Sequence, residues 1–242
     1  ASEALLRWEN PEKGLLFPSR FLRAAEESGL ILPIGGWVLK QACRDAVAWG
    51  KQIGQEFGLA VNVNVSARQF AEPNFTRQVN DALIESGLAP KQLRLEITEA
   101  GVMETGEEAI DKLRTLKDSG VRVYLDDFGT GYSSLKYLQR LPIDGIKIDR
   151  SFTSQLDSEE RTLGISKVIL QMGEMFGLDV TAEGVETERQ LELLTDLSCP
   201  TAQGNYFCRP MSSEAFSVFL ALRSENDRES NVINFRKPTP TV

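Results

Sequence analysis

The 242-residue chain contains no histidine. This absence excludes a Ser-His-Asp triad, a histidine general base and a zinc site with histidine ligands. The three cysteines, Cys43, Cys199 and Cys208, are odd in number and lack CxxC spacing, so we expect neither a disulfide framework nor a thiolate metal site. Reduced thiols in a cytosolic protein are the simpler expectation.

Long apolar runs and an excess of positive charge are also missing. No apolar stretch approaches the roughly 20 residues that a membrane-spanning helix needs, and the first residues show no signal-peptide pattern. With 27 basic and 35 acidic residues, the formal net charge of -8 argues against binding of DNA or RNA duplexes. We therefore expect a cytoplasmic domain, whose full-length parent could be membrane-tethered. Its acidic groups could hold hard divalent cations.

What the chain does contain is a regular alternation of apolar strands and amphipathic helices. It predicts a mainly parallel sheet in an α/β fold, with about seven strands where a (β/α)8 barrel has eight. An open doubly wound sheet is the competing architecture, although no G-x-G-x-x-G fingerprint supports it. Residues 1–223 are expected to form the domain and the polar residues 224–242 a flexible tail. The predicted strands are 3–8, 59–65, 93–97, 121–125, 145–149, 178–182 and 202–207.

Polar side chains occur within or at the ends of these strands. In a barrel, chemistry takes place at the C-terminal strand ends, and any one of these residues alone could equally be structural. Carboxylates that converge there repel one another unless cations neutralise them. Two Mg²⁺ or Mn²⁺ ions about 3.5–4 Å apart could polarise a phosphoryl group and generate hydroxide. The residues concerned are Glu3, Asn64, Glu96, Asp126, Asp127, Lys147 and Glu183.

The stretch that begins at Asp126 and Asp127 continues as Phe-Gly-Thr-Gly, a flexible loop. Ser133 and Ser134 follow as candidate N-caps of a short helix. Two acids before such a loop suggest a cation site with a movable cover, and a solvated turn with an Asp cap is the alternative. The Asp-Phe-Gly triplet also occurs in protein kinases, but no H-R-D catalytic loop precedes it, so a kinase is excluded.

Several motifs together resemble the EAL-domain family of cyclic di-GMP phosphodiesterases, in family order from residue 3 to about 222. Members of that family have a strand and turn ahead of the Glu-Ala-Leu motif, so the resemblance implies a TIM-like (β/α)8 barrel that lacks its leading strand here. The motifs are Glu3-Ala4-Leu5, Asn64-Val-Ser-Ala-Arg-Gln69, Leu95-Glu96-Ile97-Thr98-Glu99, Asp126-Asp-Phe-Gly-Thr-Gly-Tyr-Ser-Ser-Leu135, Lys147-Ile-Asp149, Ala182-Glu-Gly-Val-Glu186 and Gln203-Gly204.

The resemblance also implies roles for individual residues. Glu183, Lys147 and Asp127 match catalytic positions, with Glu183 favoured as the base and Lys147 as its electrostatic partner, although either could handle the proton. One metal would be held by Glu3, Asn64, Glu96 and Asp126, and a second by Asp126 with Asp127. Substrate contacts are expected from Arg7, Leu6, Gln203 and Asp149, and positioning of the loop from Glu99, Glu186, Gly129 and Gly131.

The reaction that the resemblance implies is hydrolysis of one phosphodiester bond of cyclic di-GMP to linear pGpG, by a water that two metal ions activate, in bacterial second-messenger signalling. The alternative is a catalytically silent cyclic di-GMP receptor that uses the same pocket. A phosphodiesterase of some other barrel family is a third possibility, which would not require the Asn64 and Lys147 motifs. The family resemblance further implies a homodimer and upstream sensory or regulatory domains.

Overall fold

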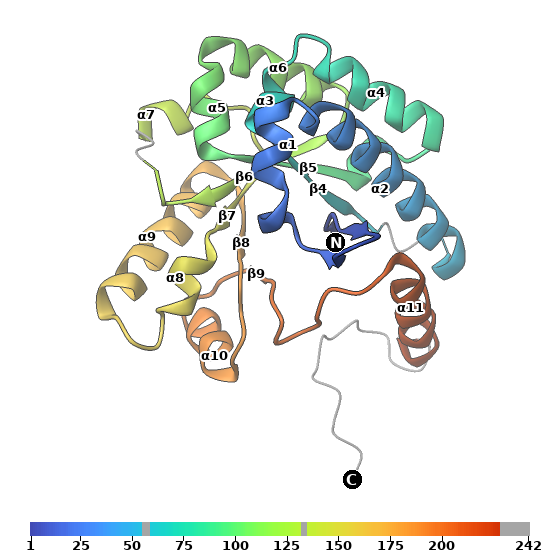
Figure 1. The fold of residues 1–242 in the computed structure, drawn as a ribbon. Helices are drawn as coiled ribbons and strands as arrows, with labels where there is room; N and C mark the ends of the chain where they lie inside the picture. The colour runs from blue at the N-terminus through green and yellow to red at the C-terminus, as the bar shows by residue number, and fades with distance from the viewer. Residues whose placement is uncertain (55–58, 132–134, 228–242) are drawn as a thin grey trace.

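In a computed structural model, residues 1–54, 59–131 and 135–227 are described, and they form one curved parallel sheet covered by helices (Figure 1). The seven strands are neighbours in chain order and every pair is parallel. The predicted α/β fold with seven parallel strands is therefore confirmed. The strands are β1 (Ser2–Ala4), β4 (Val61–Val65), β5 (Leu93–Thr98), β6 (Arg122–Phe128), β7 (Gly145–Ile148), β8 (Asp179–Ala182) and β9 (Thr201–Ala202).

The helices that connect these strands include several of the predicted ones. The sequence predicts helices at residues 75–86 and 160–176, each closed by a glycine, and the 12-residue helix α4 and the 17-residue helix α9 have these bounds. The helices are α1 (Leu22–Ser28), α2 (Ile31–Ile53), α3 (Ala67–Ala71), α4 (Phe75–Ser86), α5 (Glu99–Thr105), α6 (Glu107–Asp118), α7 (Leu135–Leu138), α8 (Arg150–Ser154), α9 (Glu160–Phe176), α10 (Glu188–Asp196) and α11 (Ser213–Asp227).

Three short helices were not predicted from the sequence. Helices α3, α5 and α8 directly follow β4, β5 and β7, and each begins where a side chain accepts a hydrogen bond from a backbone N–H of the first turn. These N-cap residues are Ser66, Thr98 and Asp149. Helices of five to seven residues span too few turns to give a clear apolar period.

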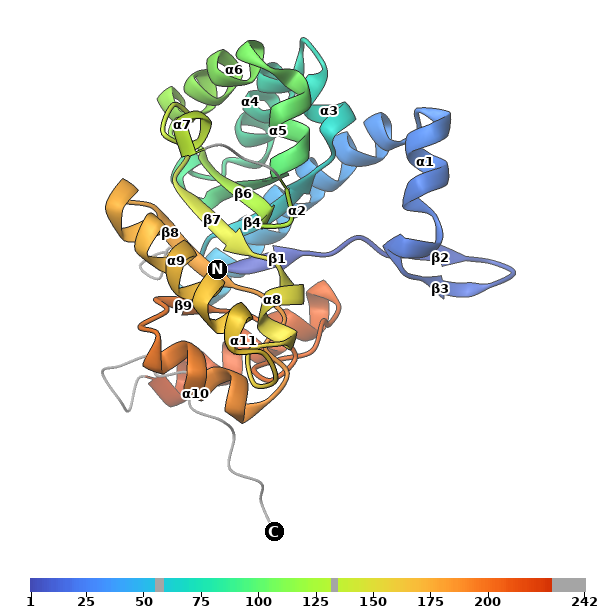
Figure 2. The same ribbon diagram turned by 90° about the vertical axis from the view of Figure 1, so that its left-hand side faces the viewer.

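The first predicted strand, residues 3–8, is wrong as a single element. Strand β1 ends at Ala4, and a separate antiparallel hairpin follows, formed by β2 (Trp8–Asn10) and β3 (Gly14–Leu16). The Asn10 side chain accepts the backbone N–H groups of residues 12 and 13, both at 3.0 Å, and Gly14 has a φ of 69°. These turn contacts fold the chain back locally, and the hairpin stands apart from the sheet (Figure 2).

The C-terminal part of the chain also differs from the prediction in two places. Strand β9 begins at Thr201, and only Ala202 of the last predicted strand, residues 202–207, pairs with β8, because residues 203–206 turn over the backbone of Val185 instead. Helix α11 continues to Asp227, so residues 224–227 of the predicted flexible tail are helical. Residues 228–242, like Ser133 and Ser134, lie outside the described residues.

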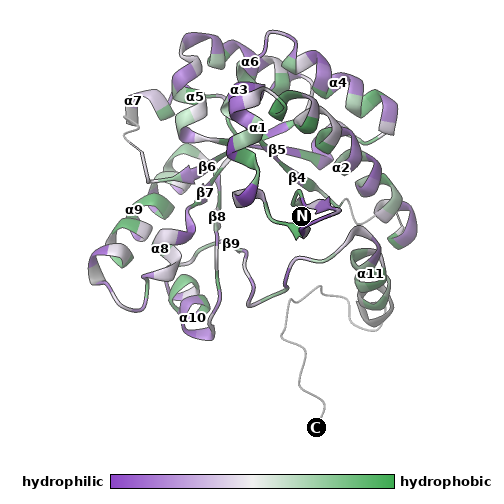
Figure 3. Ribbon diagram, in the orientation of Figure 1, coloured by the Kyte–Doolittle hydropathy of each residue, from purple (hydrophilic) through white to green (hydrophobic). Residues whose placement is uncertain are grey.

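The core lies between the sheet and its helices, and its position determines which strand residues face inward. Val61, Val63 and Val65 of β4 are buried in the main apolar cluster. Because successive strand residues point to opposite faces, the Asn residues between them point to the concave inner face of the sheet. Figure 3 shows hydrophobic residues in green and hydrophilic residues in purple, and both kinds occur along the same strands and helices. The sheet thus has an apolar outer layer and a polar inner layer, in which the candidate site lies.

Candidate active site

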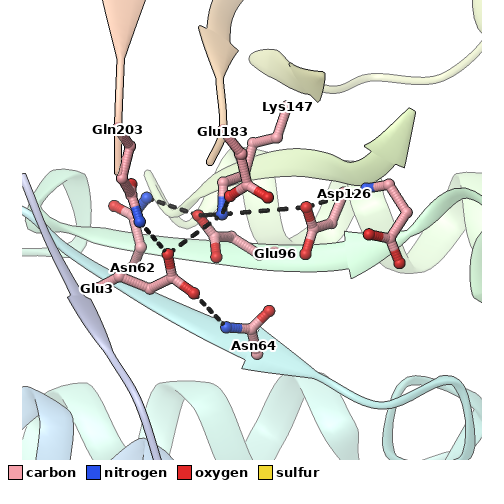
Figure 4. Close-up of polar contacts among 9 residues, drawn as sticks. Glu3, Asn62, Asn64, Glu96, Asp126, Lys147, Glu183 and Gln203 are labelled. Atoms are coloured by element: carbon pink, nitrogen blue, oxygen red, sulfur yellow. Dashed lines mark hydrogen bonds and ion pairs between the residues drawn. The ribbon is translucent and has the colours of Figure 1, made fainter. Parts of the chain in front are cut away.

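Lys147 lies at the centre of a group of acids on the inner face of the sheet (Figure 4). Its side chain on β7 is 1% exposed, and its Nζ lies 2.7 Å from Glu96 Oε1 and 3.4 Å from Glu3 Oε2. It also pairs with Glu183 Oε1 and lies 3.9 Å from Asp126 Oδ1. One ammonium group is therefore surrounded by four carboxylates from β1, β5, β6 and the end of β8.

The charges of this group are strongly coupled. Burial alone would lower the pKa of Lys147, but the four surrounding carboxylates outweigh it and raise this pKa. Burial raises the pKa of Glu96 to about 8 and that of Glu183 to about 7, although Lys147 acts in the opposite direction on both. Burial also raises the pKa of Asp126. Four acids thus share one lysine, and further positive charge or bound protons would stabilise the site.

Amide side chains hold two of the carboxylates in place. Asn64 Nδ2 donates to Glu3 Oε1 at 2.8 Å, and Gln203 Nε2 donates to the other oxygen of the same carboxylate. Asn62 Nδ2 donates to Glu96 Oε1 at 2.6 Å. Asn64 and Gln203 are among the site residues predicted from the sequence, whereas Asn62 is not. The alternation Val-Asn-Val-Asn-Val in β4 could have found it, because residues 62 and 64 point to the same face.

The donor atoms of the site suit a hard divalent cation. Glu96 Oε2 is buried and lacks a hydrogen-bond partner within the described residues. In its ionised form this oxygen could coordinate a cation. Carboxylate and amide oxygens are the ligands that Mg²⁺ takes in proteins. Across the described residues, no three acidic or cysteine side chains already form a cluster that could hold a metal ion. The donor atoms therefore fit a divalent cation. In this structure the Lys147 ammonium group lies at the centre of the acids.

Asp127 lies beside this group in a strained conformation. Its φ of 53° is in the left-handed region, which costs a residue other than glycine roughly 1–3 kcal/mol. Its backbone N–H donates to Asp126 Oδ1 at 2.9 Å, and its carbonyl accepts the Thr130 hydroxyl at 2.8 Å. Burial and the neighbouring Asp126 and Asp149 raise the pKa of its side chain. The turn therefore fixes two adjacent carboxyl groups at the end of β6.

The loop after Asp127 is held by Glu99, the first residue of α5. Glu99 Oε2 accepts the backbone N–H of Gly129 at 3.4 Å. A Cβ atom on Gly131 would lie 2.6 Å from Glu99 Oε1, so a larger residue at position 131 would displace this carboxylate. Glu186 is exposed, and its backbone N–H donates to Gln190 Oε1 at 2.8 Å. Three of the four residues expected to position the loop therefore lie together, namely Glu99, Gly129 and Gly131. The fourth, Glu186, lies in the turn before α10.

Comparison with known proteins identifies the family. The model of the EAL domain matches residues 1–210. The chain belongs to the EAL family. It is 44% identical over 219 residues to the bifunctional diguanylate cyclase/cyclic di-GMP phosphodiesterase MucR of Pseudomonas aeruginosa, covering 90% of this chain and 32% of MucR. It is 41% identical over 218 residues to the cyclic di-GMP phosphodiesterase NbdA of the same organism, covering 90% of this chain and 28% of NbdA.

A solved structure also resembles this EAL domain closely. The P. aeruginosa MucR phosphodiesterase in a complex with c-di-GMP superposes with a TM-score of 0.85 at 44% identity, over 88% of this chain and 86% of that one. The seven-stranded sheet with its outer helices is thus the TIM-like barrel of EAL domains, with one strand fewer than eight. The chain spans less than a third of the length of MucR and of NbdA. In its described part, no helix has the length and apolar character to cross a bilayer.

The remaining expected substrate residues of this EAL domain lie outside the Lys147 group. Arg7 Nη1 donates to the Leu6 carbonyl at 2.7 Å, and its guanidinium lies over the Phe17 ring. Asp149 caps α8 by accepting the Ser151 N–H at 3.0 Å. Burial acts to raise the pKa of Asp149, but the hydrogen bonds from Ser151 outweigh it and lower this pKa.

Proposed function

We propose that this EAL domain hydrolyses one phosphodiester bond of cyclic di-GMP and releases linear pGpG. The observation that carries the proposal is the convergence of Glu3, Glu96, Asp126 and Glu183 on Lys147, from strands far apart in the sequence. The relatives MucR and NbdA, whose names include cyclic di-GMP phosphodiesterase, support the choice of substrate.

Glu183 and Lys147 supply the proton transfer and the charge stabilisation. With a pKa of about 7, the Glu183 carboxylate can accept a proton from the attacking water near neutral pH. Lys147 has a raised pKa and stays protonated, so its ammonium stabilises negative charge that develops on the phosphoryl oxygens. The ion pair between Lys147 and Glu183 also holds the Glu183 carboxylate in position. Glu183 is therefore the base in this proposal and Lys147 its electrostatic partner.

The acids and amides would hold two Mg²⁺ or Mn²⁺ ions. Glu3, Asn64, Glu96 and Asp126 would bind one, and Asp126 with Asp127 the other. When bound, such ions polarise the phosphoryl group and lower the pKa of water. Glu96 Oε2 supports this assignment, because it is buried and no donor in the described part of the chain reaches it.

Incubation with cyclic di-GMP and Mg²⁺ or Mn²⁺, with the product identified by chromatography, tests the proposal. We expect pGpG to form and EDTA to prevent its formation. Binding of cyclic di-GMP without any pGpG would refute hydrolysis and favour the silent receptor.

We also propose that the domain works in the cytoplasm as a homodimer joined to sensory or regulatory domains. The additional domains are supported by the lengths of MucR and NbdA, which are more than three times as long as the segment that matches this chain. The dimer and the location follow from the family resemblance. Light scattering coupled to gel filtration of the purified chain tests the dimer. A mass equal to a single copy at micromolar concentration would refute it.

A further inference from the structure

The β2–β3 hairpin has two faces of different character. Its register pairs Trp8 with Leu16 and Glu9 with Leu15, so the next opposite pair is Arg7 and Phe17. Residues that lie directly opposite each other in an antiparallel pair point to the same face, and alternate residues share a face. Arg7, Phe17 and Leu15 therefore lie on one face, and Trp8 lies on the other.

The face with Trp8 anchors the hairpin to the domain. The Trp8 ring packs edge-on against the ring of Phe21, which is buried at the start of α1, with the centroids 5.7 Å apart and an interplanar angle of 82°. Phe17 precedes the 3-10 turn Pro18–Arg20, and its carbonyl accepts the Arg20 N–H at 2.9 Å. Both strands of the hairpin are thus held by contacts with the chain that follows them.

The opposite face is apolar, exposed and carries one cation. Phe17 is 55% exposed and Leu15 is 58% exposed. The Arg7 guanidinium lies 4.7 Å from the centre of the Phe17 ring, an arrangement in which the cation is attracted to the ring. Its hydrogen bond to the Leu6 carbonyl uses one of the five N–H groups of the guanidinium. This face therefore offers a ligand both apolar contacts and one cation.

The chain leads directly from the acidic site to this face. Arg7 follows Glu3 by four residues, and Glu3 is one of the acids paired with Lys147. Strand β1 ends at Ala4 and leads directly to the hairpin, which extends beyond the strand ends of the sheet (Figure 2). A ligand whose phosphate lay among the acids could therefore extend toward Arg7 and Phe17.

We propose that Phe17, beside the substrate contact already expected from Arg7, forms a platform for one guanine base of the cyclic dinucleotide and so determines substrate affinity. The planar base would stack on the face of the Phe17 ring that the Arg7 guanidinium does not cover, and Arg7 would contact the neighbouring phosphate. A purine joined to a phosphate matches both parts of this face, which has an apolar ring and a cation. The inference depends on cyclic di-GMP being the substrate.

Steady-state kinetics of Phe17→Ala and Phe17→Tyr test the platform. Loss of one base–aromatic stack should raise KM for cyclic di-GMP about tenfold in Phe17→Ala while kcat changes by less than about twofold. Phe17→Tyr keeps an aromatic ring and should restore KM. Ile84→Ala is the matched control, since Ile84 is a 79% exposed apolar residue of α4. An unchanged KM in Phe17→Ala, or an equal loss in Phe17→Tyr, would overturn the proposal.

A binding measurement separates failure of the platform from failure of the proposed function. Calorimetric titration with cyclic di-GMP should give a Kd about tenfold weaker for Phe17→Ala than for the unmodified chain, whether or not hydrolysis occurs. If no pGpG forms but the affinities differ in this way, the platform stands and the hydrolysis proposal fails. Equal affinities would refute the platform, and a thermal melt of Phe17→Ala within about 2 °C of the unmodified chain would show that the fold is retained.

Discussion

Replacing Lys147 with methionine removes the positive charge that the buried acids share while nearly keeping the side-chain volume. The lysine is 1% exposed, so water cannot replace its ammonium group. Glu96 and Glu183, which are its nearest partners, would then lie in the protein interior with no cation between them. This substitution therefore isolates the electrostatic contribution of one residue from packing.

The expected loss of stability depends on pH. Breaking a buried ion pair by removing one partner costs roughly 3–5 kcal/mol, which for a domain of this size lowers Tm by roughly 6–20 °C. In the unmodified chain Lys147 stays charged from pH 6 to 8.5, because its folded-state pKa is raised. In the variant, the pKa values of Glu96 and Glu183 should rise further above those of the unfolded chain. The folded state then binds more protons than the unfolded state, so stability increases as pH falls.

Thermal and denaturant unfolding in EDTA at pH 6 and 8.5 would measure this effect. We expect the full loss at pH 8.5 and less than about half of it at pH 6. Lys40→Met is the matched control, because Lys40 pairs with Glu85 at 2.8 Å on the surface and exposed pairs contribute roughly 0.2–1 kcal/mol. Equal losses in the two variants, or a loss in Lys147→Met that is the same at both pH values, would refute the electrostatic account of the site.

Three further predictions concern catalysis, the loop and the thiols. Glu96→Gln should lower kcat for cyclic di-GMP by about 100-fold or more, because the site loses a carboxylate oxygen that could coordinate a metal. Gly131→Ala should lower kcat by about tenfold or more, since its Cβ would lie 2.6 Å from Glu99 Oε1 and displace the residue that holds the loop. Cys208 is exposed and should react with a thiol reagent at pH 8 in the native protein. Cys43 is buried, and burial raises its pKa to about 11, so it should react only after the protein unfolds.

Matched variants make these three outcomes decisive. Glu85→Gln removes a surface carboxylate and should leave kcat unchanged, so a similar loss in both glutamine variants would contradict the role given to Glu96. Gly36→Ala places a methyl group in open space on α2 and should have no effect on turnover. Full activity in Gly131→Ala would contradict the loop model. Mass spectrometry identifies the labelled cysteines, and rapid native labelling of Cys43 would contradict its burial.

Local structure explains why some elements could not be predicted. The apolar period of the long helices and of the buried strands is strong enough to give their approximate bounds from sequence. The short helices after β4, β5 and β7 depend on single capping side chains, and the hairpin depends on the Asn10 turn, so neither leaves a periodic signal. Leu5 and Leu6 extend the apolar pattern of the first strand past its end at Ala4, so the sequence predicts one strand there.

The sequence by itself determined the class of fold and the face on which the polar residues lie. Strand residues alternate between two faces, so Asn64, Glu96 and Lys147 had to point away from the apolar layer wherever the strands paired. The tertiary structure alone decided which of these groups touch. Lys147 and Glu3 are 144 residues apart and meet because β7 and β1 curve toward the same interior, and Asn62 supports Glu96 because β4 and β5 are neighbours. Contacts of this kind depend on the curvature and register of the whole sheet, which local sequence does not encode.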